Sequence, residues 1–240
     1  MSHTAIVTGG TRGIGAAISI SLSEAGHRVA ATYAGNDEAA QAFKAETGIS
    51  VYKFDVADFD QCAKSIASIE ADLGPADILV NNAGITRDGT LHRMNFEQWN
   101  AVLQTNLSSC YNMCSNVIEG MRERGFGRIV NIGSVNGQAG QYGQVNYAAA
   151  KSGIHGFTKA LALEGAAKGI TVNAIAPGYV DTDMVRAVPE KVLEKIIATI
   201  PVGRLGYASD IARAVMFLVA DDATFVTGST LSINGGQHMY

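Results

Sequence analysis

The sequence predicts an α/β fold in which a doubly wound, mostly parallel sheet is covered by helices on both faces. Three observations lead to this fold class. Strand-like and helix-like segments alternate along the whole chain, a glycine-rich turn joins the first strand to the first helix, and small or polar residues follow several strands directly. Hydrophobic residues form 47% of the 240 positions, and no linker or internal repeat divides them. We therefore expect residues 1–240 to form a single domain.

Seven short apolar segments are the expected strands. They cover residues 4–8, 28–33, 50–55, 77–80, 127–133, 170–175 and 229–233. Helices are expected in the intervals, because parallel strands need crossover connections. The segment 183–199 is expected to be helical from the spacing of Val188, Val192 and Ile196, and to form a mobile lid that excludes water when it closes.

The first strand runs directly into the turn GGTRGIG at residues 9–15. A helical pattern follows, because Ile18, Leu22 and Ala25 recur at intervals of four and three before Gly26. Glycines at such a Rossmann-like turn let the backbone approach a pyrophosphate, which then meets amide donors at the helix N-terminus. A glycine-rich turn can also be a mere connection. The expected cofactor-binding residues are Gly9, Thr11, Arg12, Gly13, Ile14 and Gly15.

The end of the second strand indicates which dinucleotide would bind. Enzymes that use NAD commonly place an acidic side chain there for the ribose 2′-hydroxyl. This chain has Ala31, Thr32 and Tyr33 instead, with no carboxylate to repel a 2′-phosphate. Arg12 is a candidate partner for that phosphate, although an arginine at a turn is also an ordinary solvated residue. We predict NADPH/NADP as the cofactor, with Tyr33 beside it.

Two further strand ends carry small and polar residues. The strand at 77–80 is followed by residues that suit a cofactor passing over the edge of the sheet. These candidates are Asn82, Ala83 and Gly84. Ser134 follows the strand at 127–133 and precedes Tyr147 by thirteen residues. Its hydroxyl is a candidate donor to a substrate carbonyl, while a lone serine here is more often a turn or helix-capping residue.

Tyr147 and Lys151 are separated by three alanines, so on a helix their side chains lie on one face, one turn apart. At about 5 Å and an effective dielectric of about 20, one ammonium group stabilises a phenolate by about 3 kcal/mol. We therefore expect Lys151 to lower the phenol pKa by about two units and make Tyr147 an effective acid. The alternative is a half-buried aromatic residue near a solvated lysine.

The combination of TGGTRGIG, NNAG, Asn106, Ser134, YAAAK and Pro177-Gly178 resembles the short-chain dehydrogenase/reductase family along essentially the whole chain. Within the family, three runs are similar to the NADPH-dependent acetoacetyl-CoA reductases of polyhydroxyalkanoate synthesis. These runs are NNAGITRD, MRERGFGRIVNIGSVNGQAGQYGQVNYAAAK and IPVGRLG. The chain also resembles the 3-oxoacyl-carrier-protein reductases, the nearest relatives of that group.

The resemblance implies roles for individual residues. Asn106 matches the asparagine that holds a proton-relay water near the lysine, and Tyr147 and Lys151 also contact the cofactor. The implied catalytic set is Asn106, Ser134, Tyr147 and Lys151. Further implied cofactor contacts are Asp55, Val56, Pro177, Gly178, Val180 and Thr182. Implied substrate contacts are Asp88, Ser134, Gln138, Gln141, Tyr142, Gln144, Tyr147 and Tyr179, with Tyr142 and Tyr179 bracketing a short acyl chain unless they are ordinary packed loop aromatics.

The implied reaction is NADPH-dependent reduction of acetoacetyl-CoA, or a related short 3-oxoacyl thioester, to an (R)-3-hydroxyacyl-CoA for polyhydroxybutyrate synthesis. Tyr147 would donate the proton while Ser134 polarises the carbonyl. The alternative is a 3-oxoacyl-[acyl-carrier-protein] reductase of fatty-acid synthesis. Its acidic carrier would meet a basic patch near the entrance, formed by Arg122, Arg124, Arg128 and Lys168. A non-catalytic NADP-sensing regulator is an alternative of another class, but it would not need the catalytic set.

Composition narrows the partners and the location. The net charge of −4 and the lack of a basic, aromatic cluster argue against nucleic-acid binding. No run of about twenty apolar residues exists to span a membrane, and the first residues lack the pattern of a secretory signal. We therefore expect no membrane partner and a cytoplasmic location. Of the three cysteines, Cys110 and Cys114 have the spacing of residues that pack along a helix, and no metal site is expected.

The quaternary structure is suggested by two weakly charged, alanine-containing segments. Residues 98–121 and 147–165 have more apolar positions than one covered helix face requires. We expect these segments to be buried in a homotetramer, which the family resemblance also implies. Burial within the monomer is the alternative.

Overall fold

A computed structural model of the chain describes residues 2–186 and 188–239. Its strands are β1 (Thr4–Val7), β2 (Arg28–Tyr33), β3 (Ser50–Lys53), β4 (Ala76–Asn81), β5 (Gly127–Ile132), β6 (Ile170–Pro177) and β7 (Thr230–Ile233). They form one parallel seven-stranded sheet in the order β3-β2-β1-β4-β5-β6-β7. All seven expected strands are confirmed, and each end lies within two residues of its expected position.

Helices fill the intervals between the strands. The α-helices are α1 (Gly13–Glu24), α2 (Asp37–Thr47), α3 (Phe59–Leu73), α4 (Phe96–Leu103), α5 (Ser109–Arg124), α6 (Val135–Ala139), α7 (Val145–Gly165), α8 (Asp183–Arg186), α9 (Glu190–Ala198) and α10 (Ala208–Val219). Local sequence sets several of their ends. Asn95 begins α4 with a capping box that includes Gln98, and Gly48 ends α2 in the left-handed conformation with φ of 73°.

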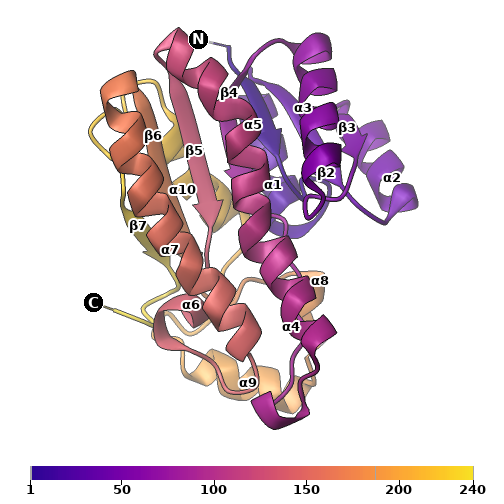
Figure 1. Cartoon of the computed structure of the whole chain (residues 1–240). Coiled ribbons are helices and arrows are strands. Elements are labelled where there is room, and N and C mark those ends of the chain that lie inside the picture. The colour runs from indigo at the N-terminus through magenta and orange to yellow at the C-terminus, as the bar shows by residue number, and fades with distance from the viewer. Residues whose placement is uncertain (1, 187, 240) are drawn as a thin grey trace.

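The helices cover both faces of the sheet, so the predicted fold class is confirmed. On one face α1, α2 and α10 bury residues such as Ile18, Phe43 and Val215 against the strands. On the other face α3, α5 and α7 bury residues such as Ile66 and Met113, and Figure 1 looks onto this side. Every residue of β1, β5 and β6 is buried, which explains why these strands are continuous apolar runs rather than alternating ones.

The expected lid helix at 183–199 is corrected by the structure, which has two helices there, α8 and α9. Proline explains the restart at α9. Pro189 has no N–H to donate, it disfavours helical geometry at Val188, and it precedes the first residue of α9. Residue 187 lies outside the described residues. The mobility of this segment stays a prediction.

Two smaller expectations concern helices as well. Cys110 and Cys114 are buried on α5, as their spacing predicted, and both are free thiols. Over the described ranges, we find no helix with the length and apolar character needed to cross a bilayer.

Candidate active site

The predicted site residues gather beyond the carboxyl ends of the strands. In Figure 1 the arrow of β5 points toward the lower part of the molecule, where α6, α8 and α9 lie. The sheet order places β1 beside β4, with β2 and β3 on one side and β5 to β7 on the other. The chain therefore changes winding direction between β1 and β4, which is where open α/β sheets bind ligands.

The glycine turn after β1 is shaped for close approach of a ligand to the backbone. Gly9 and Gly13 have φ of 61° and 53°, a region that other residues rarely adopt. A Cβ on Gly15 would lie 2.1 Å from the Gly9 carbonyl oxygen, so no side chain fits there. Helix α1 begins at Gly13 with no acidic residue in its first turn. The turn therefore presents bare amide groups and the positive end of a helix, which fits a pyrophosphate.

The predicted cofactor residues from other strand ends adjoin this turn. The Thr8 hydroxyl oxygen accepts hydrogen bonds from the N–H groups of Asn82 and Ala83, both at 2.9 Å. The Asn82 amide donates to the Thr8 carbonyl at 2.9 Å. A Cβ on Gly13 would lie 3.5 Å from Cγ2 of Thr182, although these residues are far apart in the sequence. The sequence analysis did not single out Thr8, whose only signal is its place directly before the glycines.

The segment after β6 is held against the end of β7 through its backbone. Pro177 ends β6, and the Gly178 N–H donates to the Ile233 carbonyl at 3.0 Å. A Cβ on Gly178 would lie 2.8 Å from Cα of Asn234, so this crossing requires glycine. The Val180 side chain is buried in the core, which leaves only its backbone for the predicted cofactor contact.

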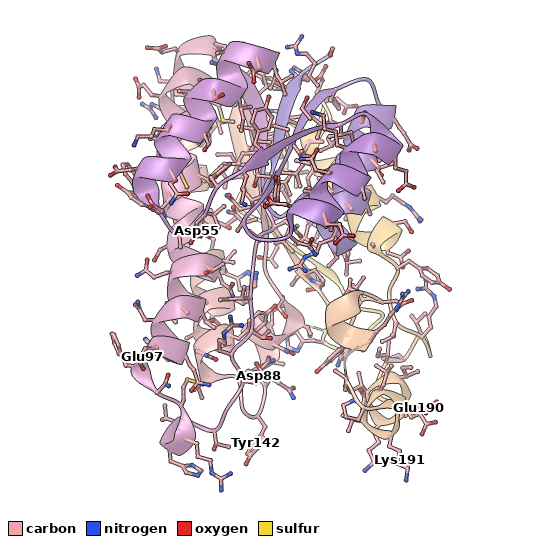
Figure 2. All side chains as sticks on the ribbon, turned by 90° about the vertical axis from the view of Figure 1, so that its right-hand side faces the viewer. Asp55, Asp88, Glu97, Tyr142, Glu190 and Lys191 are labelled. Atoms are coloured by element: carbon pink, nitrogen blue, oxygen red, sulfur yellow. The ribbon has the colours of Figure 1, made fainter. Side chains whose placement is uncertain are left out.

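The adenine end of the predicted cofactor site is more open. Asp55 is exposed after β3, with its carboxylate accepting the Ala57 N–H at 2.9 Å, and Figure 2 shows it nearer to the sheet than Asp88. The neighbouring Val56 packs its side chain in the core. Tyr33 ends β2 and lies close enough to the Asp37 carboxylate to lower its pKa.

Asp37 is an acidic group that the sequence analysis overlooked near the end of β2. It pairs with Lys53 at 2.7 Å, and this hydrogen bond lowers the pKa of Asp37. The lysine neutralises the carboxylate, so the pair as a whole adds no net charge beside Tyr33. The expectation that no acid lies close to this strand end was therefore wrong in detail, because a residue from the N-terminus of α2 folds back onto it.

Ser134 has the helix-capping role that was one of the two considered for it, and its role as a donor to a substrate carbonyl stays a prediction. It caps α6, with its Oγ accepting the Asn136 N–H at 3.1 Å, and it lies close enough to Tyr147 to lower the pKa of the phenol. Tyr147 lies in the first turn of α7, and its N–H donates to the buried Asn146 side chain at 2.8 Å. Asn146 in turn donates to the Arg87 carbonyl at 3.0 Å. Asn146 is a positioning residue that the sequence analysis did not identify.

Lys151 is only 4% exposed, and its Nζ donates to the Ile132 carbonyl at 2.7 Å. Burial lowers the pKa of Lys151 from 10.5 to about 8. The Nζ lies 5.7 Å from the centroid of the Tyr147 ring, so the two side chains are neighbours as their spacing predicted.

The predicted effect of Lys151 on the tyrosine is corrected, however. The pKa of Tyr147 is raised, chiefly because the phenol is removed from water. The nearby Ser134 hydroxyl lowers it, and the charges of Asp88 and Tyr179 raise it further. The lysine does not offset burial because its own pKa of about 8 lies below that of the phenol, so its charge is already lost when the phenol titrates. Tyr147 therefore keeps its proton at neutral pH and is poised as a donor.

Asn106 lies in a π-helical turn, Gln104–Ser108, between α4 and α5. Its side-chain oxygen accepts the Ile85 N–H at 2.7 Å, and its amide donates to the Ile85 carbonyl at 2.9 Å. A Cβ on Gly84 would lie 3.2 Å from Oδ1 of Asn106 and 3.7 Å from Nζ of Lys151. The asparagine therefore holds the loop after β4 beside the lysine. Its role with a relay water stays a prediction.

The predicted substrate residues are only partly brought together. Gln144 donates to the Asp88 carboxylate at 2.9 Å, and both Asp88 and Tyr179 influence Tyr147 through their charges. Gln138 instead donates to the Ser232 hydroxyl on β7 at 3.1 Å. Gln141 is exposed.

Tyr142 and Tyr179 lie in different surroundings. Tyr142 is 88% exposed, and in Figure 2 it projects at the lower end of the molecule with Asp88, across from Glu190 and Lys191 of α9. Tyr179 lines an apolar cavity with residues such as Ile200. The tyrosine contact with substrate stays a prediction.

The expected basic patch for a carrier protein is contradicted. Arg128 is 1% exposed and donates to the backbone carbonyls of Ala220 and Asp221. Arg124 bonds the Ala76 carbonyl and pairs with Asp77 at the beginning of β4. These residues end α5 or begin β5, so the fold places them at the amino ends of the strands, opposite the site.

Comparison with known proteins identifies the family. The family model described as Enoyl-(Acyl carrier protein) reductase matches residues 9–238. The chain belongs to the short-chain dehydrogenase/reductase family. An acetoacetyl-CoA reductase of Shinella zoogloeoides is 66% identical over 238 residues, 99% of either chain. One of Rhizobium meliloti (strain 1021) is 65% identical over 239 residues, also 99% of each.

A relative with a different name is more distant. A 3-oxoacyl-[acyl-carrier-protein] reductase of Escherichia coli (strain K12) is 47% identical over 237 residues, 98% of this chain and 97% of that one. The family assignment and the similarity to acetoacetyl-CoA reductases, both read from the sequence, are confirmed. This family member is an oxidoreductase related to enzymes that use a nicotinamide cofactor.

Proposed function

We propose that this chain is an NADPH-dependent acetoacetyl-CoA reductase that forms the (R)-3-hydroxyacyl-CoA precursor of polyhydroxybutyrate. The observation that carries the proposal is the group formed by Ser134, Tyr147 and Lys151 beside the glycine turn, in a chain 66% identical to a protein of that name. Ser134 lies close enough to Tyr147 to lower its pKa, so two hydroxyl groups stand together, which suits one carbonyl oxygen.

The chain's own residues supply the acid and the carbonyl binding. When bound, the nicotinamide supplies the hydride. The Asn136 N–H occupies an acceptor site on Ser134, so the serine hydroxyl proton is available to the substrate ketone. Tyr147 holds its proton at neutral pH and donates it to the oxygen that becomes an alkoxide. Lys151 then stabilises the phenolate that remains.

The experiment that tests this function compares two thioester carriers. We expect NADPH oxidation with acetoacetyl-CoA, with a kcat/KM at least tenfold above that for an acetoacetyl carrier-protein conjugate. The basic patch expected to dock an acidic carrier does not lie near the site, because Arg124 and Arg128 are at the other end of the sheet. A clear advantage for the conjugate would make the carrier-protein reductase, the name of the 47% identical relative, the better assignment. Oxidation with neither would favour the NADP-sensing regulator.

NADPH rather than NADH is proposed from the surroundings of Arg12. This residue is exposed at the start of α1, and within the described residues no carboxylate forms an ion pair with it. Arg12→Ala should raise the KM for NADPH by about tenfold to a hundredfold through loss of a charge-assisted hydrogen bond to the 2′-phosphate. The KM for NADH should change less than about threefold, since NADH lacks this group. Steady-state kinetics with each cofactor measure the difference.

A matched control for this prediction is Lys64→Ala, which removes an exposed cation on α3. It should leave the ratio of the two KM values unchanged, because a general loss of positive charge acts weakly at a distance. Equal effects of Arg12→Ala on both cofactors would contradict the assigned contact.

We also propose a homotetramer, in the cytoplasm. Leu163 on α7 is 84% exposed, and on the same side of the sheet Tyr111 on α5 is exposed and stacks on Phe59. Apolar groups gathered on helix faces favour association, and buried free thiols suit a reducing compartment. Sedimentation at micromolar concentration should give a tetramer, and Leu163→Glu should give smaller species. A monomeric wild type would contradict this.

A further inference from the structure

Asn136, to which no role has been assigned above, connects the catalytic serine to two predicted substrate residues through hydrogen bonds. Its backbone N–H donates to the Ser134 hydroxyl oxygen at 3.1 Å. Its side-chain amide donates to Oε1 of Gln144 at 3.0 Å. Gln144 in turn donates through Nε2 to the Asp88 carboxylate at 2.9 Å. A continuous chain of hydrogen bonds therefore links the catalytic serine to the loop after β4.

The direction of these hydrogen bonds is fixed by the Asp88 carboxylate, where the series ends. An ionised carboxylate only accepts hydrogen bonds, so Gln144 must turn its NH₂ group toward Asp88. The Gln144 oxygen then faces Asn136, so Asn136 must donate a hydrogen bond to it through its side-chain NH₂ group. Only an asparagine or a similar donor at position 136 satisfies this requirement. An acceptor there would set two oxygens against each other.

The backbone holds the partners of the chain in register. The Gly89 N–H donates to the Gly143 carbonyl at 2.8 Å, and Gly89 forms an isolated parallel bridge with Gln144. The loop after β4 and the segment before α7 are thus fixed to each other independently of side chains. Rotation of the Gln144 amide is the freedom that remains, and Asn136 and Asp88 remove it.

We propose that Asn136 is a specificity-determining positioning residue, which holds Gln144 as a hydrogen-bond donor for the second carbonyl of a 3-oxoacyl thioester. The inference rests on the proposed function. Ser134 and Tyr147 take the ketone oxygen, and the thioester oxygen needs a separate donor. Gln144 uses one N–H on Asp88 and its oxygen on Asn136, and it has no further side-chain partner among the described residues. Its second N–H is the donor.

The test is a double-mutant cycle that reverses the donor and acceptor order of these hydrogen bonds. Asn136→Asp replaces the donor with an acceptor and should raise the KM for acetoacetyl-CoA by about tenfold. The backbone N–H at 136 survives, so kcat should fall less than about threefold. Adding Asp88→Asn restores a matched donor and acceptor with the original net charge. In the double variant every donor again meets an acceptor, but the Gln144 oxygen now stands where its NH₂ group stood. Its KM should therefore stay about tenfold above that of the Asp88→Asn single variant.

Two results would overturn the inference. One is a KM for Asn136→Asp within twofold of wild type, and the other is a double variant whose KM returns to within threefold of that of Asp88→Asn. The Kd for NADPH, from fluorescence, should stay constant through the cycle, whereas a merely structural role would weaken it too. Calorimetry of acetoacetyl-CoA with the NADP⁺ complex separates the two proposals. If the wild-type protein binds acetoacetyl-CoA but does not reduce it, the proposed function is wrong, and the inference about Asn136 is still tested by the Kd of each variant for acetoacetyl-CoA. If the wild-type protein does not bind acetoacetyl-CoA, both proposals are wrong.

Discussion

Tyr147→Phe should lower kcat for acetoacetyl-CoA reduction by about 10²- to 10⁴-fold, the usual effect of removing a general acid. The phenol holds its proton because burial raises its pKa, and phenylalanine has no proton to give. The aromatic ring and the backbone bond from residue 147 to Asn146 are retained. The Kd for NADPH should therefore change less than about threefold. Single-turnover kinetics and fluorescence titration measure the two quantities.

A second tyrosine variant provides the control. Tyr52→Phe removes a hydroxyl that donates to Asp72 at 3.0 Å, on the edge strand β3. It should leave kcat unchanged, because this hydroxyl belongs to another part of the sheet. If Tyr147→Phe turned over at more than a tenth of the wild-type rate, another group would have to donate the proton.

Lys151→Met should abolish most activity and at the same time stabilise the fold. Loss of the cation beside the phenolate should lower kcat by about 10²- to 10³-fold. A buried ammonium destabilises the native state, and the fall in pKa from 10.5 to about 8 corresponds to about 3 kcal/mol. The Ile132 carbonyl loses its hydrogen-bond partner in the variant, which destabilises the fold by about 1 kcal/mol and reduces the net gain in stability. The variant should be about 2 kcal/mol more stable at pH 7, as denaturant unfolding without cofactor would measure.

The stability difference should depend on pH in a defined direction. Below pH about 8 the lysine is charged in both the folded and the unfolded chain, so the penalty of burying the charge is fully present. Between pH about 8 and 10.5 the unfolded chain binds the proton and the folded chain does not. Wild-type stability therefore rises with pH in this window relative to Lys151→Met, and the gap between them closes.

Lys159→Met is the matched control, because Lys159 is exposed on the same helix α7. It should leave kcat and the stability at pH 7 unchanged. A Lys151→Met variant less stable than wild type at pH 7 would mean that the Nζ bond to Ile132 outweighs the penalty of burial.

Local patterns were enough to predict much of this molecule. The seven strands and the glycine turn depend on runs of neighbouring residues, whose preferences act over a few positions. The spacing of Tyr147 and Lys151 was informative for the same reason, since a helix converts a separation of four into contact. The break before α9 is also visible locally in Pro189, and it was overlooked in favour of the apolar spacing.

Other expectations failed because charge and burial depend on distant parts of the chain. Arg128 looks like a surface residue in the sequence, yet it is buried against the backbone of residues 220 and 221. Asp37 lies only four residues after Tyr33, but the lysine that neutralises it, Lys53, comes from the separate strand β3. Spacing alone placed Lys151 near Tyr147 without revealing that the Ile132 carbonyl takes its Nζ.

The sequence by itself determined which elements form, how they alternate and which residue types stand at the strand ends, because hydrophobic periodicity and turn chemistry are local properties. Only the tertiary structure decided the pKa values and the hydrogen-bond partners of the side chains at those strand ends. The raised pKa of Tyr147, the lowered pKa of Lys151 and the bonds between Asn136, Gln144 and Asp88 arise from burial and orientation. Both depend on segments that meet only when the sheet has assembled.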